Sequence, residues 1–98
     1  MSNSLSGQVH LAGYLEVPAE RRAAVLAALP AHIALTRAEP GCLTFSVTPS
    51  PDDADRFLVA EVFANQPAFE AHQARAGGSE WAIVTQDLPR HYTIHTTP

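Results

Sequence analysis

One carboxyl group lies in surroundings that could make it chemically useful. Glu61 interrupts RFLVAEVFA (residues 56–64), a nearly continuous apolar run that is typical of a buried strand. A buried carboxyl group must be paired, hydrogen-bonded or neutral, because its charge is costly away from water. Burial raises the pKa of such a group and suits it to proton transfer near neutral pH. The alternative is a structural role, in which Glu61 anchors a helix N–H, a histidine or an arginine.

An imidazole is expected near this carboxyl group. His72 follows Phe69 by three residues, so both project from the same side of a predicted helix. If that side faces the sheet, His72 approaches Glu61, and a Glu–His pair would fix the imidazole tautomer and raise its basicity, as deprotonation of a phenol requires. The alternative is a core or rim histidine with satisfied hydrogen bonds. His32, on the preceding predicted helix, is a second candidate, with a partly exposed helical position as its alternative.

Aromatic side chains could enclose a planar ligand beside these groups. Trp81 is the strongest candidate, because its short predicted helix (80–86) would cover the pocket. Most aromatic residues at regular spacing belong to the core. The expected substrate-binding residues are Trp81, Phe63, Phe45, Phe69 and His32.

The remaining histidines and the cysteine indicate no metal or redox site. His91 and His95 share one face of a predicted strand, and His10 could lie on the neighbouring strand. Strand positions four apart are separated by roughly 13 Å, which is too far to bind one ion easily. We expect all three at polar positions on the surface. Cys42 has no basic neighbour in sequence, and we expect a buried, unreactive thiol.

Composition excludes several classes of protein. The 98 residues include six arginines, no lysine and one cysteine, and the net charge is −4. Without lysine there is no Schiff-base chemistry, and one cysteine allows no internal disulfide and no CxxC motif. Negative charge with scattered arginines argues against nucleic-acid binding. No apolar run is long enough to span a membrane and no secretory signal is visible, so we expect a cytoplasmic protein.

The pattern of apolar residues predicts a single α+β domain over residues 8–98, after a flexible leader at 1–7. Apolar alternation and turn signals divide the domain into strands and helices. The predicted strands are 8–16, 42–48, 56–64 and 90–96, and the predicted helices end at 39, 76 and 86. This order is that of the ferredoxin-like split βαβ plan, a four-stranded antiparallel sheet with helices on one face.

Three local features are also predicted. Pro30 removes a backbone hydrogen bond and should kink or break the first helix near residues 27–30. The packed stripe of that helix should follow helical spacing, through Leu26, Leu29, Ile33 and Arg37. In the second strand the alternating apolar side chains are Leu43, Phe45 and Val47.

The strand at 56–64 is apolar on both faces, so both faces should be covered. One face meets the helices, and the simplest cover for the other is the sheet of an identical subunit. A short chain would gain both core and pocket volume in this way. The sequence therefore predicts a homodimer.

Three segments together resemble the antibiotic biosynthesis monooxygenase domain family. They are EPGCLTFSV (39–47), FLVAEVFANQPAFEAH (57–72) and the turn and helix at 77–83. The markers are the Glu-Pro-Gly-Cys turn, a glutamate inside the third strand and an Ala-Phe-x-x-His run. The resemblance extends from about residue 8 to residue 94 and implies a dimeric α+β barrel. It also implies a range of activities: cofactor-free oxygenases of quinols or anthrone-like polyketides, haem-degrading enzymes, and members with no assigned activity.

The leading hypothesis is a cofactor-independent monooxygenase that oxidises a quinol, polyphenolic or polyketide-like aromatic substrate with O₂. His72 would be the base and Glu61 its orienter, with no flavin, haem or metal required. The alternative is a non-catalytic or stress-associated ligand-binding barrel, which predicts a pocket without a buried titratable pair. A third hypothesis, haem binding and degradation, is disfavoured because SEWAIVTQ (79–86) lacks the axial histidine that the resemblance would place there.

Overall fold

The computed structural model describes residues 7–98, which form four strands and three helices. The strands are β1 (Val9–Glu16), β2 (Cys42–Pro49), β3 (Arg56–Phe63) and β4 (Arg90–Thr96), and the helices are α1 (Ala19–Arg37), α2 (Gln66–Gly77) and α3 (Glu80–Val84). Most of the predicted leader, residues 1–6, lies outside the described residues. Its last residue, Gly7, donates its N–H to the carbonyl oxygen of Thr97 at 2.8 Å.

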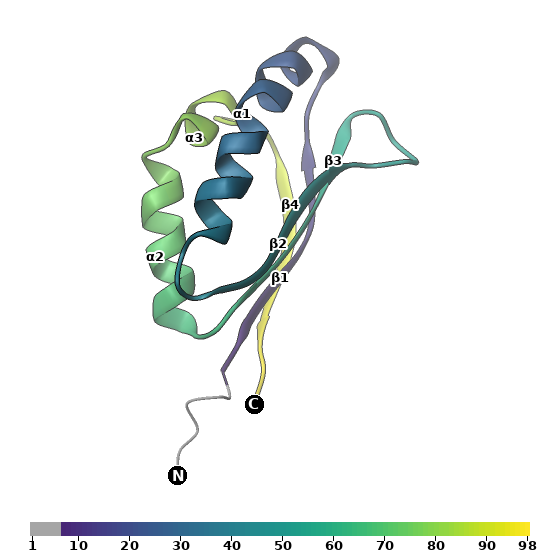
Figure 1. Ribbon diagram of the computed structural model, residues 1–98. Helices are drawn as coiled ribbons and strands as arrows, with labels where there is room; N and C mark the ends of the chain where they lie inside the picture. The colour runs from purple at the N-terminus through teal and green to yellow at the C-terminus, as the bar shows by residue number, and fades with distance from the viewer. Residues whose placement is uncertain (1–6) are drawn as a thin grey trace.

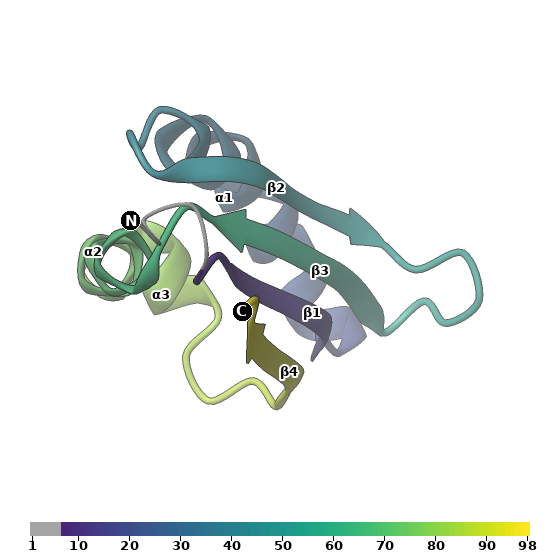
Figure 2. The same cartoon turned by 90° about the horizontal axis from the view of Figure 1, so that it is seen from below.

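All four strands join one antiparallel sheet in the order β2-β3-β1-β4, as Figure 2 shows from one end. Both long helices, α1 and α2, lie on the same side of that sheet (Figure 1). The ferredoxin-like α+β fold predicted from the sequence is therefore confirmed. The core lies between sheet and helices, and its largest fully buried side chains are Phe57 and Phe63.

The strands turn their apolar side chains inward almost as the alternation predicts. In β1, the side chains of Val9, Leu11 and Leu15 are buried. In β2, the prediction fails at Leu43, which is 49% exposed. The pairing of β2 with β3 shifts register between residues 42 and 44, and this irregularity takes Leu43 out of the alternation.

Helix α1 is unbroken across Pro30, so the predicted break is wrong. Pro30 lies on the exposed side of the helix, where a carbonyl group that loses its helical partner can bind water instead. The predicted inward position of Leu26 is also wrong, because this side chain is 44% exposed. The buried stripe lies one position earlier, through Val25, Ala28, Leu29, His32 and Thr36.

The opposite face of the sheet is not covered by any helix of residues 7–98 (Figure 1). Its centre includes Leu58, which is 41% exposed, and Tyr14, whose ring centre lies 4.1 Å from the guanidinium carbon of Arg56. A second cover for this face would have to come from outside the single chain, so the homodimer stays a prediction. Among the same residues, no helix is both long and apolar enough to cross a membrane.

Candidate functional site

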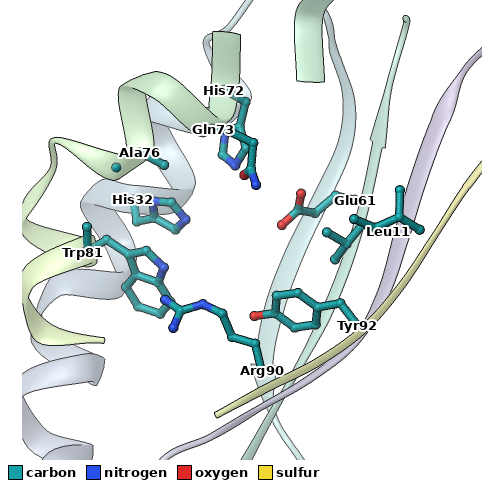
Figure 3. A pocket seen from close by; sticks show the side chains of 12 residues that line it. Leu11, His32, Glu61, His72, Gln73, Ala76, Trp81, Arg90 and Tyr92 are labelled. Atoms are coloured by element: carbon teal, nitrogen blue, oxygen red, sulfur yellow. The ribbon is translucent and has the colours of Figure 1, made fainter. Parts of the chain in front are cut away.

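A cavity of about 280 Å³ opens between the inner face of the sheet and the helices. Figure 3 shows its two walls, with Glu61 and Tyr92 facing His32, His72 and Trp81 across the space. The sheet contributes Leu11, Glu61, Arg90, Tyr92 and Ile94. The helices and their connections contribute His32, His72, Gln73, Ala76, Gly77, Trp81 and Ala82. The cavity thus combines one carboxyl group, two imidazoles and aromatic surface.

Glu61 is the buried carboxyl group of this cavity. It pairs across the sheet with Leu11 of β1 and Phe45 of β2, so its side chain points to the helix side. Only 8% of the residue is exposed, and its Oε1 atom is buried without a hydrogen-bond partner among residues 7–98. Burial, with a smaller effect of the Glu39 carboxylate, raises the pKa of Glu61 to about 7. This carboxyl group can therefore both bind and release a proton near neutral pH.

His72 lies on α2 and is held by a different carboxylate from the one expected. Its Nδ1 atom is 3.0 Å from Oε1 of Glu39, whose other oxygen accepts a hydrogen bond of 2.6 Å from Nε of Arg75. The predicted pairing with Glu61 is wrong, because no hydrogen bond joins His72 to Glu61 in the described chain. The turn after α1 brings Glu39 to Nδ1 instead. Glu61 and His72 nevertheless line the same cavity.

The surroundings of the His72 imidazole favour its neutral form. Burial lowers its pKa, and the nearby Glu39 carboxylate only partly offsets that effect. The Glu39 carboxylate accepts a hydrogen bond from Arg75 and has no hydrogen to donate. Its bond with Nδ1 of His72 therefore requires that Nδ1 carries the proton. The other nitrogen, Nε2, is then an unprotonated acceptor.

His32 and Trp81 form a stacked pair on the helix side. Their ring centres are 4.6 Å apart and their planes differ by 5°. His32 is 5% exposed, so the alternative of a partly exposed helical position is wrong. Burial, with smaller effects of His72 and Arg75, lowers the pKa of His32 to about 4. The structure thus brings together four of the predicted residues: Glu61, His72, His32 and Trp81.

Three predicted wall residues lie behind the cavity instead of lining it. Phe45, Phe63 and Phe69 are buried in the core. The Phe63 ring centre is 4.9 Å from that of His72, and the Phe45 ring centre is 5.3 Å from that of His32. None of the three lines the cavity, so their expected place as cavity walls is wrong. Phe45 and Phe63 pack behind the two imidazoles, and Phe69 packs on Phe63.

Four residues of the site were not predicted from the sequence. Arg90 and Tyr92 line the cavity from the sheet, and the pair of Glu39 and Arg75 holds His72 in place. Tyr92 alternates with exposed histidines in β4, and that alternation is the signal that could have placed it inward. Burial raises its pKa to about 12. Arg90 has a structural role, because its guanidinium donates hydrogen bonds to the carbonyl oxygens of residues 85 and 88 and to the hydroxyl of Thr85.

The other histidines lie on the outer face of the sheet, as predicted. His10 stacks on His95 with ring centres 4.8 Å apart, and His91 stacks on Tyr14 at 4.6 Å. Within residues 7–98 no three His, Cys, Asp or Glu side chains gather in a way that could hold a metal ion. Cys42 is only half-buried, and burial raises the pKa of its thiol, which keeps it protonated.

Comparison with known proteins assigns this arrangement to a family. The model of the antibiotic biosynthesis monooxygenase family matches residues 8–82, which include Glu61, His72, His32 and Trp81. The chain belongs to this family. No protein of curated function matches the chain.

Several solved structures share the fold over nearly the whole length of this chain. A Nitrosomonas europaea protein, provisionally assigned as an antibiotic biosynthesis monooxygenase, is 25% identical with a TM-score of 0.77, covering 90% of this chain and 95% of its own. A Bacteroides thetaiotaomicron protein of unknown function, described as a possible oxidoreductase, is 18% identical with a TM-score of 0.80, covering 93% and 98%. A Caulobacter crescentus protein with the same provisional assignment as the first is 21% identical with a TM-score of 0.69, covering 94% and 89%.

Proposed function

We propose that this family member is a cofactor-independent monooxygenase that oxidises a quinol or related polyphenol with O₂. The observation that carries the proposal is Glu61, a buried carboxyl group with an unpaired oxygen on the cavity and a pKa of about 7. General bases work best when their pKa lies near the working pH. Family membership supports the reaction class, and the cavity supports the substrate class.

In the proposed reaction the substrate supplies every electron. The Glu61 carboxylate accepts a hydroxyl proton from the quinol, and the resulting phenolate gives one electron to O₂. Superoxide then forms a C–O bond with the ring radical, and the peroxide regains the proton from Glu61. Loss of water by cleavage of the O–O bond leaves a hydroxyquinone. One oxygen atom of O₂ enters the product, the other leaves as water, and the four electrons that O₂ accepts come from the ring.

The two imidazoles orient the substrate in this proposal. His72 was expected as the base with Glu61 as its orienter; the hydrogen bond from His72 to Glu39 supports a revision in which Glu61 is the base. Nε2 of His72 accepts a hydrogen bond from a second substrate hydroxyl. The stacked surface of Trp81 and His32 provides a flat wall for the ring. A cavity of about 280 Å³ is at the lower end of ligand-site volumes, which favours a small aromatic molecule.

The competing hypotheses receive less support from the cavity. A purely ligand-binding barrel predicted a pocket without a buried titratable pair, whereas Glu61 and His72 are both buried on this cavity. A volume of about 280 Å³ is small for a tetrapyrrole, so the size of the cavity argues against haem. Titration with haemin tests that hypothesis, and we expect no shift of the Soret band.

We further propose that the enzyme is a cytoplasmic homodimer formed through the outer face of the sheet. Exposed Leu58 and half-buried Val62, which lie on the same outward face of β3, support an apolar contact there. The lone thiol of Cys42 suits a reducing compartment.

An oxygen-uptake assay with 1,4-naphthohydroquinone as the probe quinol tests the proposed activity, with the spontaneous oxidation rate subtracted. Glu61→Gln keeps the shape of the side chain and removes the base, so kcat/KM should fall by roughly 10²–10⁴-fold. Glu70→Gln is the matched control, because Glu70 is exposed on α2, away from the cavity lining, and accepts a hydrogen bond from Gln66. Equal rates for the two variants would contradict the role of Glu61.

A further inference from the structure

A second, smaller cavity is lined by two residues that each have a buried polar atom without a hydrogen-bond partner in the described chain. Nδ1 of His32 and Nη1 of Arg75 are both buried and have no hydrogen-bond partner within residues 7–98. The two side chains line a second cavity of about 30 Å³, between α1 and the start of α3. A polar cavity of this size has room for a water molecule, which satisfies buried polar groups in many proteins.

The guanidinium of Arg75 is fixed in place by its other nitrogens. Its Nε atom donates to Oε2 of Glu39 at 2.6 Å, and Nη2 donates to Oγ1 of Thr36 at 2.9 Å. Because the group is planar, these two bonds also determine where Nη1 lies. Arginine has no acceptor atom, so Nη1 can only donate. A water that accepts this hydrogen bond has both of its own hydrogens left to donate.

Arg75 carries a positive charge on the small cavity that it shares with His32. At Nδ1 of His32 this charge disfavours an N–H group, which it repels, and favours a lone pair, which it attracts. The rings of Trp81, Phe45 and His72 pack against the imidazole of His32. None of them forms a hydrogen bond with its Nδ1 atom. The neutral state of the ring leaves one nitrogen as an acceptor and the other as a donor.

We propose that a buried water bridges Nη1 of Arg75 to Nδ1 of His32 and holds His32 in its Nε2–H tautomer. Arg75 is then a positioning residue for both imidazoles of the cavity, through Glu39 for His72 and through the water for His32. The two rings, whose centres are 6.0 Å apart, have opposite tautomers. His72 presents an acceptor at Nε2 and His32 presents a donor at Nε2. The use of this donor by a substrate oxygen rests on the proposed function; the tautomers themselves do not.

Long-range ¹H–¹⁵N correlation spectra of protein labelled with ¹⁵N-histidine test the proposal directly. His32→Gln and His72→Gln assign the two sets of resonances. At pH 7.5 we expect Nε2 of His32 and Nδ1 of His72 to carry the protons. Arg75→Met should abolish the tautomer preference of His32, moving its two nitrogen resonances towards each other. Arg22→Met is the matched control, because Arg22 bonds to the β2–β3 loop at Ala54 and Asp55.

Two results would overturn the proposal: an Nδ1–H tautomer of His32 in the unchanged protein, or an unchanged His32 spectrum in Arg75→Met. If Arg75→Met does not fold, Arg75→Lys replaces it, since a lysine keeps the charge without the fixed fork of donors and should also release His32. The spectra need no substrate. An inactive protein with the expected tautomers would therefore contradict the monooxygenase proposal and leave this one standing.

Discussion

The imidazole of His72 is joined to the carboxylate of Glu39 by a hydrogen bond of 3.0 Å between Nδ1 and Oε1. This bond crosses from α2 to the turn that follows α1, so it ties the two helices together beside the cavity. It also directs the unprotonated nitrogen of His72 away from Glu39. The Oε1 atom of Glu61, on the opposite wall, has no hydrogen-bond partner in the part of the chain that the structure describes. Glu39 thus orients the imidazole of His72, while the carboxyl group of Glu61 faces the cavity.

Glu39→Gln should weaken both the fold and the site. The amide replaces one of the two accepting oxygens with an NH₂ group, so either His72 or Arg75 then faces a donor in place of its acceptor. We expect the free energy of unfolding to fall by about 1–3 kcal/mol and kcat/KM to fall by about tenfold or more through loss of His72 orientation. Urea unfolding and the oxygen-uptake assay measure these effects. Glu70→Gln should change stability by less than about 0.5 kcal/mol, and an equally small effect of Glu39→Gln would contradict the role of Glu39.

The pH dependence of stability should contain two opposed contributions from the cavity. The pKa of Glu61 is raised from its ordinary value of 4.5 to about 7, so the folded state binds more protons between these values and loses stability as pH rises through them. The pKa of His32 is lowered from 6.5 to about 4, so the folded state binds fewer protons there and loses stability as pH falls. Between about pH 4.5 and 6.5 the two slopes largely cancel.

Single substitutions should separate these contributions. Glu61→Gln removes the cost of a buried carboxylate and should stabilise the protein at pH 8 by up to about 3 kcal/mol, while making its stability fall more steeply in acid than that of the unchanged protein. His32→Gln should change the acid slope in the opposite direction. Urea unfolding at a series of pH values measures both, with Glu70→Gln, at an exposed position of α2, as the control. Parallel curves for all the variants would contradict the assigned pKa shifts.

Gly13 should be intolerant of any side chain. Its φ is +153°, and a Cβ atom there would overlap the carbonyl oxygen of His91 on the neighbouring strand. Gly13→Ala should therefore cost about 2–3 kcal/mol or more of unfolding free energy. Gly77→Ala is the control, because a Cβ at Gly77 meets nothing within 4 Å, and it should be neutral or stabilising by up to about 1 kcal/mol. A Gly13→Ala variant as stable as Gly77→Ala would contradict this backbone geometry.

The homodimer prediction can be tested on the outer face of the sheet. Leu58→Arg places a charge at a central position of that face and should convert the dimer to a monomer, as measured by light scattering during gel filtration. Leu26→Arg is closely matched, since the two leucines are 41% and 44% exposed, but Leu26 lies on α1. We expect it to stay dimeric. A monomeric unchanged protein, or two variants with the same mass, would contradict the proposed interface.

Much of the fold followed from residue patterns because the strands are short, amphipathic and bounded by clear turn residues. Asn65 and Ser79 cap the N-termini of α2 and α3, each accepting a hydrogen bond from a backbone N–H three residues later. The errors have local causes. A register shift exposes Leu43, and α1 tolerates Pro30 because that position faces water. Neither effect is visible from periodicity alone.

The site was harder to predict than the fold because its contacts span long stretches of sequence. Glu61 was recognisable as a polar residue in an apolar strand. The partner of His72 was not, since Glu39 lies 33 residues away and its approach depends on the exact turn after α1. Spacing likewise could not show that Phe63 packs behind His72 while Trp81 lines the cavity. Such choices depend on how the helices pack on the sheet.

Isotope labelling tests the proposed monooxygenase reaction at the level of single oxygen atoms. The purified protein, treated with a chelator and given no flavin, haem or metal, is supplied with 1,4-naphthohydroquinone and ¹⁸O₂, and the product is analysed by mass spectrometry. We expect one ¹⁸O atom in each hydroxyquinone and one in water. The rate should rise through about pH 7, as Glu61 loses its proton. The rate should be nearly abolished in Glu61→Gln and retained in Glu70→Gln. Product without ¹⁸O, or incorporation that is unaffected by Glu61→Gln, would contradict the proposed reaction.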